Sequence, residues 1–124
     1  MEFETLPGAA DIIRAVNTTD TPLIADTRSA LDLIGTARHL HGEVKLVVDK
    51  ADVAEDFFDL KTGLAGEVLQ KFVNYNLPLA IVGDFSGYTS KALRDFIYES
   101  NQGSAVFFVP DVETAAEKLG RVGL

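Results

Sequence analysis

The sequence predicts a single α/β domain, residues 1–124, with a four- to five-stranded, mostly parallel sheet covered by helices. Apolar runs of strand length alternate with stretches of helical spacing along the whole chain. The connections between these stretches are short, which favours right-handed crossovers within one sheet. The length of 124 residues is typical of one domain, and a hydrophobic content of 47% is sufficient for a buried core.

The longest helical pattern lies at residues 64–73 and leads directly into the most apolar strand candidate. Its apolar residues recur at the spacing of one helix face, and they are Leu64, Ala65, Val68, Leu69, Phe72 and Val73. Asp59 and Thr62 are suitable capping residues before this helix, and Pro78 disfavours helix immediately after it. The continuous apolar run at Leu79–Val82 is typical of a central parallel strand buried on both faces.

The same two patterns predict the remaining elements. We expect strands at residues 2–6, 23–25, 45–48 and 105–109, and helices at residues 9–16, 30–40, 92–97 and 112–122. Residues 50–56 are expected to form a polar, acidic connection into the central helix.

Composition and charge exclude several classes of function. The chain has no cysteine, so it forms no disulfide framework and no Cys-based zinc or iron–sulfur site. The net charge of −8 and the scattered 11 Lys and Arg argue against nucleic acid or an anionic membrane as a partner. No apolar run approaches the ~20 residues of a membrane span, and the acidic start differs from a signal peptide. We therefore expect a cytoplasmic protein.

The sequence lacks a Walker A loop, a G-x-G-x-x-G motif and a G-x-S-x-G elbow. It therefore implies no cofactor and no catalytic residue, and it leaves open whether the protein is an enzyme.

An aspartate follows each of the predicted parallel strands. These aspartates are Asp26, Asp49, Asp84 and Asp111. The carboxyl ends of parallel strands share one edge of a sheet, so Asp26, Asp49 and Asp84 are candidate ligands of Mg²⁺, with Lys50 or Lys61 contacting a phosphate. The alternative interpretation is that each aspartate caps the helix that follows it.

The turn at residues 59–63 opens the predicted central helix. Exposed backbone N–H groups and the helix dipole favour an anion at such a position. The candidate residues of a ligand or partner surface are Asp59, Lys61, Thr62, Gly63 and Asp84. Thr62 is also a candidate for phosphorylation. The alternative is an ordinary helix cap, in which the glycine allows close packing.

Three segments of the chain resemble a known family. FFDLKTG at residues 57–63 and GE-x-LQKF-x-NY at residues 66–75, with ALDLIGTAR at residues 30–38, resemble the bacterial domain-of-unknown-function family 4180. The resemblance covers nearly the whole chain and implies no established activity.

Thr62-Gly63-Leu64 is also similar to part of a conserved turn of STAS domains, of the anti-sigma-factor-antagonist type. In many members of that family a partner kinase phosphorylates the second hydroxyl residue of the turn. Here Leu60 and Lys61 stand between Asp59 and Thr62, where that family has one serine. The similarity implies a STAS-like strand order, whereas the alternation of elements alone also fits a flavodoxin-like order.

The leading hypothesis is a non-enzymatic regulatory or protein-binding module that uses residues 59–66 and the adjacent strand-end loops. The alternative is a protein or enzyme that binds a small ligand or a Mg²⁺–phosphate group at the acidic edge of the sheet. A third possibility is a homodimer in which Phe57 and Phe58 pack across a two-fold axis.

Overall fold

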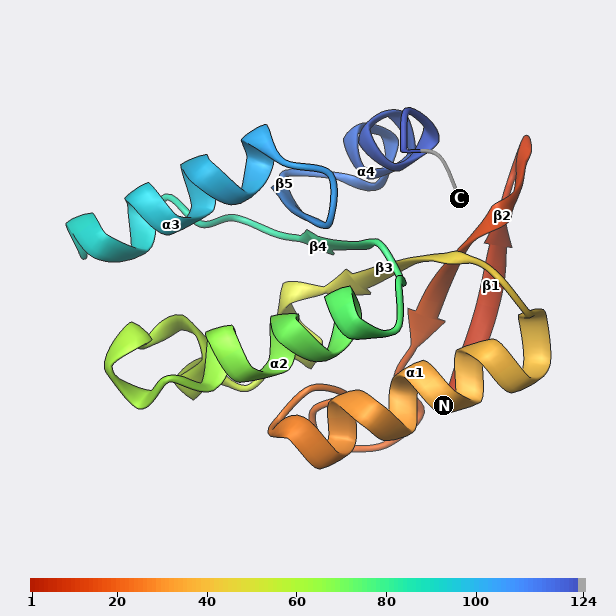
Figure 1. Ribbon diagram of the computed structural model, residues 1–124, viewed down its shortest axis with the longest axis horizontal. Helices are drawn as coiled ribbons and strands as arrows, with labels where there is room; N and C mark the ends of the chain where they lie inside the picture. The colour runs from red at the N-terminus through yellow and green to blue at the C-terminus, as the bar shows by residue number, and fades with distance from the viewer. Residues whose placement is uncertain (123–124) are drawn as a thin grey trace.

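The computed structural model describes residues 1–122, which form one five-stranded sheet and four α-helices (Figure 1). The strands are β1 (Glu2–Leu6), β2 (Ala9–Val16), β3 (Lys45–Asp49), β4 (Leu79–Val82) and β5 (Val106–Val109). The helices are α1 (Thr27–His41), α2 (Leu64–Asn74), α3 (Lys91–Gln102) and α4 (Val112–Gly120). The predicted α/β class with a mostly parallel sheet is confirmed.

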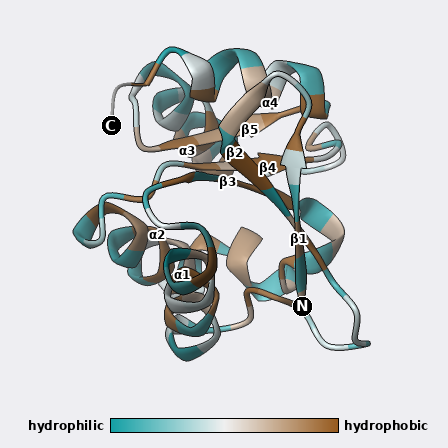
Figure 2. Cartoon of the chain, turned by 90° about the vertical axis from the view of Figure 1, so that its right-hand side faces the viewer, coloured by the Kyte–Doolittle hydropathy of each residue, from teal (hydrophilic) through white to brown (hydrophobic). Residues whose placement is uncertain are grey.

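The strands lie in the sheet in their chain order, from β1 to β5. β1 pairs antiparallel with β2, and β2 to β5 pair parallel with one another. The three helical crossovers run in the same direction across the sheet, so α1, α2 and α3 pack on one face. α4 covers the opposite face, and Figure 2 shows the apolar strands between α1 and α2 on one side and α4 on the other. This sequential order confirms neither the flavodoxin-like nor the STAS-like arrangement.

The core consists of two apolar clusters, one on each face of the sheet. In β4, Leu79 and Ile81 belong to the larger cluster beneath α1, α2 and α3. Ala80 belongs to the smaller cluster, which packs against Ala115 and Leu119 of α4. The prediction that residues 79–82 form a central strand buried on both faces is therefore confirmed.

The prediction of a helix at residues 9–16 is wrong, because this segment is strand β2. It turns back on β1 through Pro7 and Gly8, and Gly8 has the positive φ of 76° that such a turn requires. Ile13 packs into the larger cluster and Ile12 into the smaller one. A strand buried on both faces shows no alternation of apolar and polar residues, which is why its spacing also fitted a helix.

The prediction of a strand at residues 23–25 is also wrong. This segment makes one isolated bridge, between Ile24 and Val53, outside the sheet. The backbone N–H groups of Leu23 and Ile24 both donate to the Asp52 carbonyl, at 2.8 and 3.1 Å. The sheet has no place for this run because β2 already occupies the position beside β3.

Phe57 and Phe58 are buried inside the chain, with exposed fractions of 0% and 4%. Their rings contact each other edge to face, with centroids 5.0 Å apart. Because both side chains belong to the larger core cluster, the prediction that they pack across a two-fold axis is wrong. The connection that carries them is a series of short 3₁₀ helices, residues 50–52, 55–58 and 60–62.

Among residues 1–122, none of the helices combines the length and the apolarity that crossing a bilayer requires.

Candidate functional site: an acidic cavity at the carboxyl edge of the sheet

A cavity of about 460 Å³ lies at the carboxyl edge of the sheet. One wall comes from the 3₁₀ segment at residues 55–59, which follows β3, and the other comes from the loop and helix start at residues 87–93, which follow β4. We call it the acidic cavity, and its lining residues are Glu55, Asp56, Phe58, Asp59, Gly87, Tyr88, Thr89, Ser90 and Leu93. Three of these residues carry a carboxylate, and two carry an aromatic ring.

Lys50 and Gly83 bring the two walls together. A Cβ atom built on Gly83 would lie only 2.5 Å from the Cβ of Lys50, so the absence of a side chain there lets the lysine stem pass over β4. The Lys50 ammonium group then lies 5.0 Å from the ring centroid of Tyr88 and 5.4 Å from that of Phe58. These distances allow a cation–π interaction with both rings.

Tyr88 connects the lysine to a carboxylate of the opposite wall. Its ring stacks on Phe58, with centroids 5.2 Å apart and an interplanar angle of 23°. Its hydroxyl donates a hydrogen bond to Oε1 of Glu55 at 2.8 Å. Lys50, Tyr88 and Glu55 therefore form one chain of polar contacts beside the acidic cavity.

The protonation states of this group follow from the same contacts. The Tyr88 hydroxyl near the ammonium group raises the pKa of Lys50 above its ordinary value, although partial burial opposes the shift. Burial is the main reason why the pKa of Tyr88 is also raised. At neutral pH, Lys50 is therefore an ammonium ion and Tyr88 a neutral phenol. Neither group is prepared to act as a base or a nucleophile.

The predicted turn at residues 59–63 lies at the rim of the acidic cavity, to which it contributes Asp59. The Asp59 carboxylate accepts a hydrogen bond from the backbone N–H of Lys61 at 3.2 Å. The Thr62 hydroxyl donates to the Asp59 carbonyl at 2.9 Å and accepts from the N–H of Leu64 at 3.1 Å. Gly63 has a φ of 75° and immediately precedes α2. Lys61, Thr62 and Gly63 do not line the cavity, and their hydrogen bonds hold the turn that leads into α2, whose N-cap is Gly63.

Three of the four aspartates that the sequence predicted at strand ends bond to the turn or helix that follows them. Asp26 caps α1 by accepting from the N–H of Ser29 at 2.8 Å, and Asp111 caps α4 in the same way at 2.7 Å. Asp84 accepts from the N–H and the hydroxyl of Ser86, at 2.9 and 2.6 Å. These hydrogen bonds lower the pKa of each of the three carboxyl groups.

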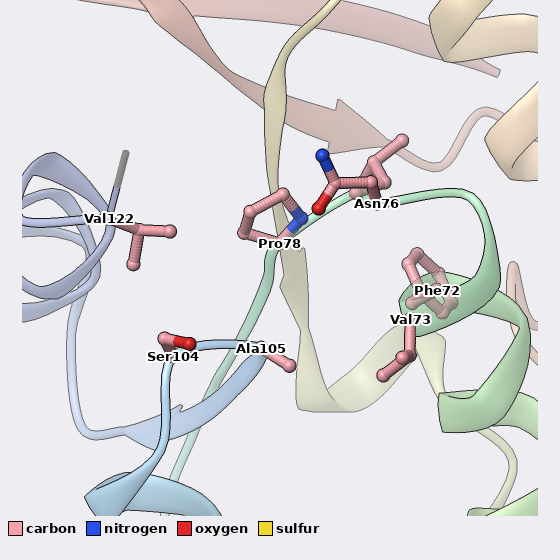
Figure 3. A pocket seen from close by; sticks show the side chains of 8 residues that line it. Phe72, Val73, Asn76, Pro78, Ser104, Ala105 and Val122 are labelled. Atoms are coloured by element: carbon pink, nitrogen blue, oxygen red, sulfur yellow. The ribbon is translucent and has the colours of Figure 1, made fainter. Parts of the chain in front are cut away.

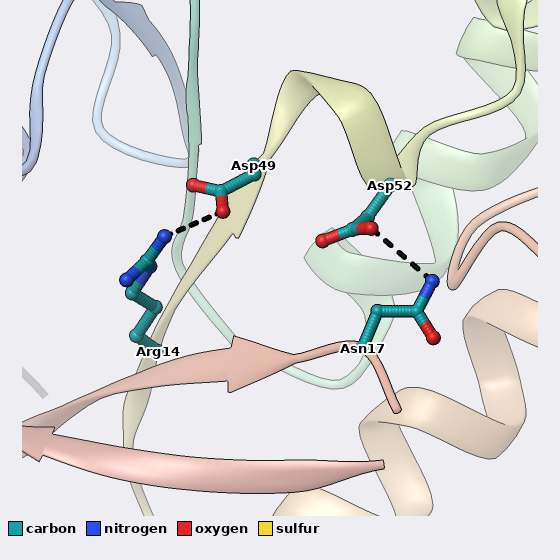
Figure 4. Close-up of polar contacts among 4 residues, drawn as sticks. All are labelled: Arg14, Asn17, Asp49 and Asp52. Carbon is teal, nitrogen blue, oxygen red and sulfur yellow. Dashed lines mark hydrogen bonds and ion pairs between the residues drawn. The ribbon is translucent and has the colours of Figure 1, made fainter. Parts of the chain in front are cut away.

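The fourth aspartate, Asp49, instead pairs with Arg14 of β2, at 2.5 Å between Oδ2 and Nη2 (Figure 4). Beside it, Nδ2 of Asn17 donates to Oδ1 of Asp52 at 3.1 Å, which ties the loop after β2 to the segment after β3. Among residues 1–122, no three His, Cys, Asp or Glu side chains are arranged to hold a metal ion. The structure therefore does not bring Asp26, Asp49 and Asp84 together as one set of ligands.

A second cavity, of about 260 Å³, lies at the amino edge of the sheet (Figure 3). Its lining residues are Phe72, Val73, Asn76, Leu77, Pro78, Ser104, Ala105 and Val122. None of these side chains is ionisable, so this cavity offers no acid, base or charged contact. Val73 is half exposed here, although its spacing predicted a buried position on α2.

Sequence reasoning found Asp59 but missed Glu55 and Tyr88, which are 33 residues apart in the chain. One feature of the sequence could have indicated this site, namely which residues directly follow two neighbouring strands. Lys50 follows the last residue of β3 and Gly83 follows the last residue of β4, and these two strands are neighbours in the sheet.

Comparison with known proteins identifies a family for most of this fold. No curated protein matches the chain, and no solved structure matches it. A family model with the description "Domain of unknown function (DUF4180)" matches residues 10–119. The matched range includes both walls of the acidic cavity. Since the match covers far more than half of the chain, the protein belongs to the DUF4180 family.

Proposed function

We propose that this domain is a non-enzymatic binding module that receives a basic side chain of a protein partner in the acidic cavity. The observation that carries the proposal is the composition of the cavity, in which Glu55, Asp56 and Asp59 line one wall of a space of about 460 Å³. Among residues 1–122, none of these three carboxylates takes part in an ion pair. An arginine or lysine side chain of a partner would supply the missing positive charge.

The charge of the whole chain supports the same class of partner. A net charge of −8 produces a negative potential that attracts basic surfaces and speeds their encounter with the protein. The acidic cavity places three exposed carboxylates side by side in one concave surface. An anionic ligand would meet repulsion at the same position.

Lys50 limits how a partner cation is held. Its ammonium group already lies against the rings of Phe58 and Tyr88. A second cation is therefore expected to contact the carboxylates of Asp56 and Asp59 at the rim rather than the ring faces. The hydrogen bond from Tyr88 fixes Glu55 as part of the wall.

The regulation that the STAS resemblance implied is not part of this proposal. The Thr62 hydroxyl donates to the Asp59 carbonyl and accepts from the Leu64 N–H. Phosphorylation would replace the hydrogen that makes the first of these bonds, at the residue before Gly63. These two hydrogen bonds thus support a structural role for Thr62 in the turn before α2.

The test is an NMR titration of the ¹⁵N-labelled full chain with a short arginine-containing peptide and with an acidic peptide of equal length. We expect the basic peptide alone to shift the amide signals of Asp59, Gly87 and Tyr88. The shifts should weaken in high salt, as expected for exposed charges.

A charge-matched pair of variants separates the cavity from general attraction to an acidic protein. Asp56→Asn/Asp59→Asn removes two charges at the rim, and Asp20→Asn/Glu113→Gln removes two exposed charges elsewhere. The first variant should lose the localised shifts and the second should keep them. Equal losses in both variants, or shifts spread over the whole surface, would refute the proposal.

A further inference from the structure

β5 is an edge strand of the sheet, because it pairs with β4 on one side only. The N–H groups of Leu79 and Gly83 donate to the carbonyls of Ala105 and Val109, at 3.0 and 2.9 Å. In a parallel ladder, alternate residues bond to the same neighbour, so Val106 and Phe108 direct their backbone groups away from β4. An edge of this kind is a template for pairing with another strand.

The side chain of Asn101 occupies this edge at Phe108. Its Nδ2 donates to the Phe108 carbonyl at 3.0 Å, and the Phe108 N–H donates to its Oδ1 at 2.7 Å. One amide thus satisfies both outward-facing backbone groups of the residue, as a neighbouring strand would. The next outward-facing residue is Pro110, which has no N–H to offer.

The sequence of β5 explains why such a block is useful. Residues 105–109, Ala-Val-Phe-Phe-Val, carry no charge and have high strand propensity. A second copy of the chain offers the same segment, so two copies could pair edge to edge about a two-fold axis. At the start of β5, a groove of about 270 Å³ between α2 and α3 is lined by the apolar residues Leu69, Phe96 and Val106, together with Glu99, Ser100 and Ser104. The groove would receive apolar side chains of that copy.

We infer that Asn101 is an intramolecular strand mimic that prevents β5 from pairing with β5 of a second copy of this chain. The contact is self-inhibitory: while the amide holds Phe108, the edge offers no continuous row of free donors and acceptors. Removal of the amide opens the edge. This inference concerns a surface separate from the acidic cavity and does not depend on the proposed function.

The test compares the mass in solution of the full-length wild type and Asn101→Ala by light scattering across a range of concentrations. We expect Asn101→Ala to associate at lower concentration than the wild type. In its least associated fraction, the amide of Phe108 should exchange with deuterium about tenfold faster, because it has lost its acceptor. Asn74→Ala is the matched control, since Asn74 also ends a helix but accepts only from Gln70 of the same helix. It should behave like the wild type.

A second variant distinguishes edge opening from loss of stability. Asn101→Asp keeps an acceptor for the Phe108 N–H but cannot donate to its carbonyl, and it places a negative charge on the edge. We expect this variant to stay in the association state of the wild type, because charge opposes strand pairing. Equal association of the Asp and Ala variants, or no added association of Asn101→Ala, would overturn the inference. If Asn101→Ala unfolds, light scattering on Asn101→Asp still tests the inference. Association of Asn101→Asp beyond the wild type would contradict it.

Discussion

Gly83→Ala tests the contact that joins the two walls of the acidic cavity. A Cβ atom at this position would lie 2.5 Å from Cβ and 2.9 Å from Cδ of Lys50. Carbon atoms pack at roughly 3.5–4.0 Å, so the closer contact must widen by about 1 Å. The Cδ atom can move by rotation of the side chain, whereas Cβ can move only with the backbone of the segment after β3. Overpacking of this kind typically costs about 1–3 kcal/mol of unfolding free energy.

The assay is chemical denaturation of Gly83→Ala, with Gly35→Ala as the matched control. Gly35 lies inside α1, and a Cβ there would meet no atom within 4 Å. The control should therefore gain about 0.5–1 kcal/mol from the better helix propensity of alanine. A change of less than about 0.5 kcal/mol in Gly83→Ala would refute the steric argument.

A double-mutant cycle with Lys50→Gly identifies the clashing partner. Glycine at position 50 removes all three Lys50 side-chain atoms that the new methyl group would meet, Cβ, Cγ and Cδ. Gly83→Ala should therefore cost less in the Lys50→Gly background than in the wild type, by most of its original penalty. An unchanged penalty would mean that the strain arises elsewhere at the end of β4.

Two further predictions concern the caps. The ordinary pKa of an aspartate is 3.8, and hydrogen bonds lower the pKa of Asp26, Asp84 and Asp111. At a pH above 3.8 these bonds stabilise the folded protein, and this contribution is lost as the pH falls below that value. The stability difference between wild type and Asp111→Asn, measured by urea unfolding from pH 5 to 2.5, should therefore shrink at the acidic end; a constant difference would contradict this linkage. Thr62→Val removes the acceptor of the Leu64 N–H at the start of α2 and should cost about 1 kcal/mol, and an unchanged thermal midpoint would show that this hydrogen bond is dispensable.

The elements predicted correctly are those whose own sequence carries the pattern. Helix α2 buries Ala65, Val68, Leu69 and Phe72, as the spacing of its apolar residues indicated. The middle of β3 and the whole of β4 are continuous apolar runs, as expected for strands that are covered on both faces. The local sequence pattern was sufficient to predict these elements, because the same residues face inward whichever segments pack against them.

Residues 9–16 were predicted as a helix and residues 23–25 as a strand, and both predictions are wrong because these assignments depend on the neighbouring segments. β2 is a strand since the turn at Gly8 pairs it with β1 and places it beside β3. Once that position is taken, Ile24 can make only an isolated bridge. Residues 9–16 and residues 23–25 are both short apolar runs, and their composition alone does not show which of them pairs with β3.

The position of the acidic cavity was predictable only in part. The turn that contains Asp59 was singled out from the sequence, and it lies at the rim. The contact between Glu55 and Tyr88 requires β3 and β4 to be adjacent, and the alternation of elements left the strand order open. A site that forms between two loops follows from topology, which local sequence patterns do not contain.

The aspartates explain which charges remain available for binding. The sequence suggested that strand-end carboxylates could hold an ion or cap the following helix, and Asp26, Asp84 and Asp111 each accept hydrogen bonds from their own turn. Each of these carboxylates already gives part of its acceptor capacity to the fold, as Asp59 does in the turn before α2, so less of that capacity is left for a ligand. Asp56 lies in the wall of the acidic cavity and shows no side-chain hydrogen bond or ion pair among residues 1–122. The partner's basic group should therefore depend most strongly on Asp56, the rim carboxylate that the fold itself does not use.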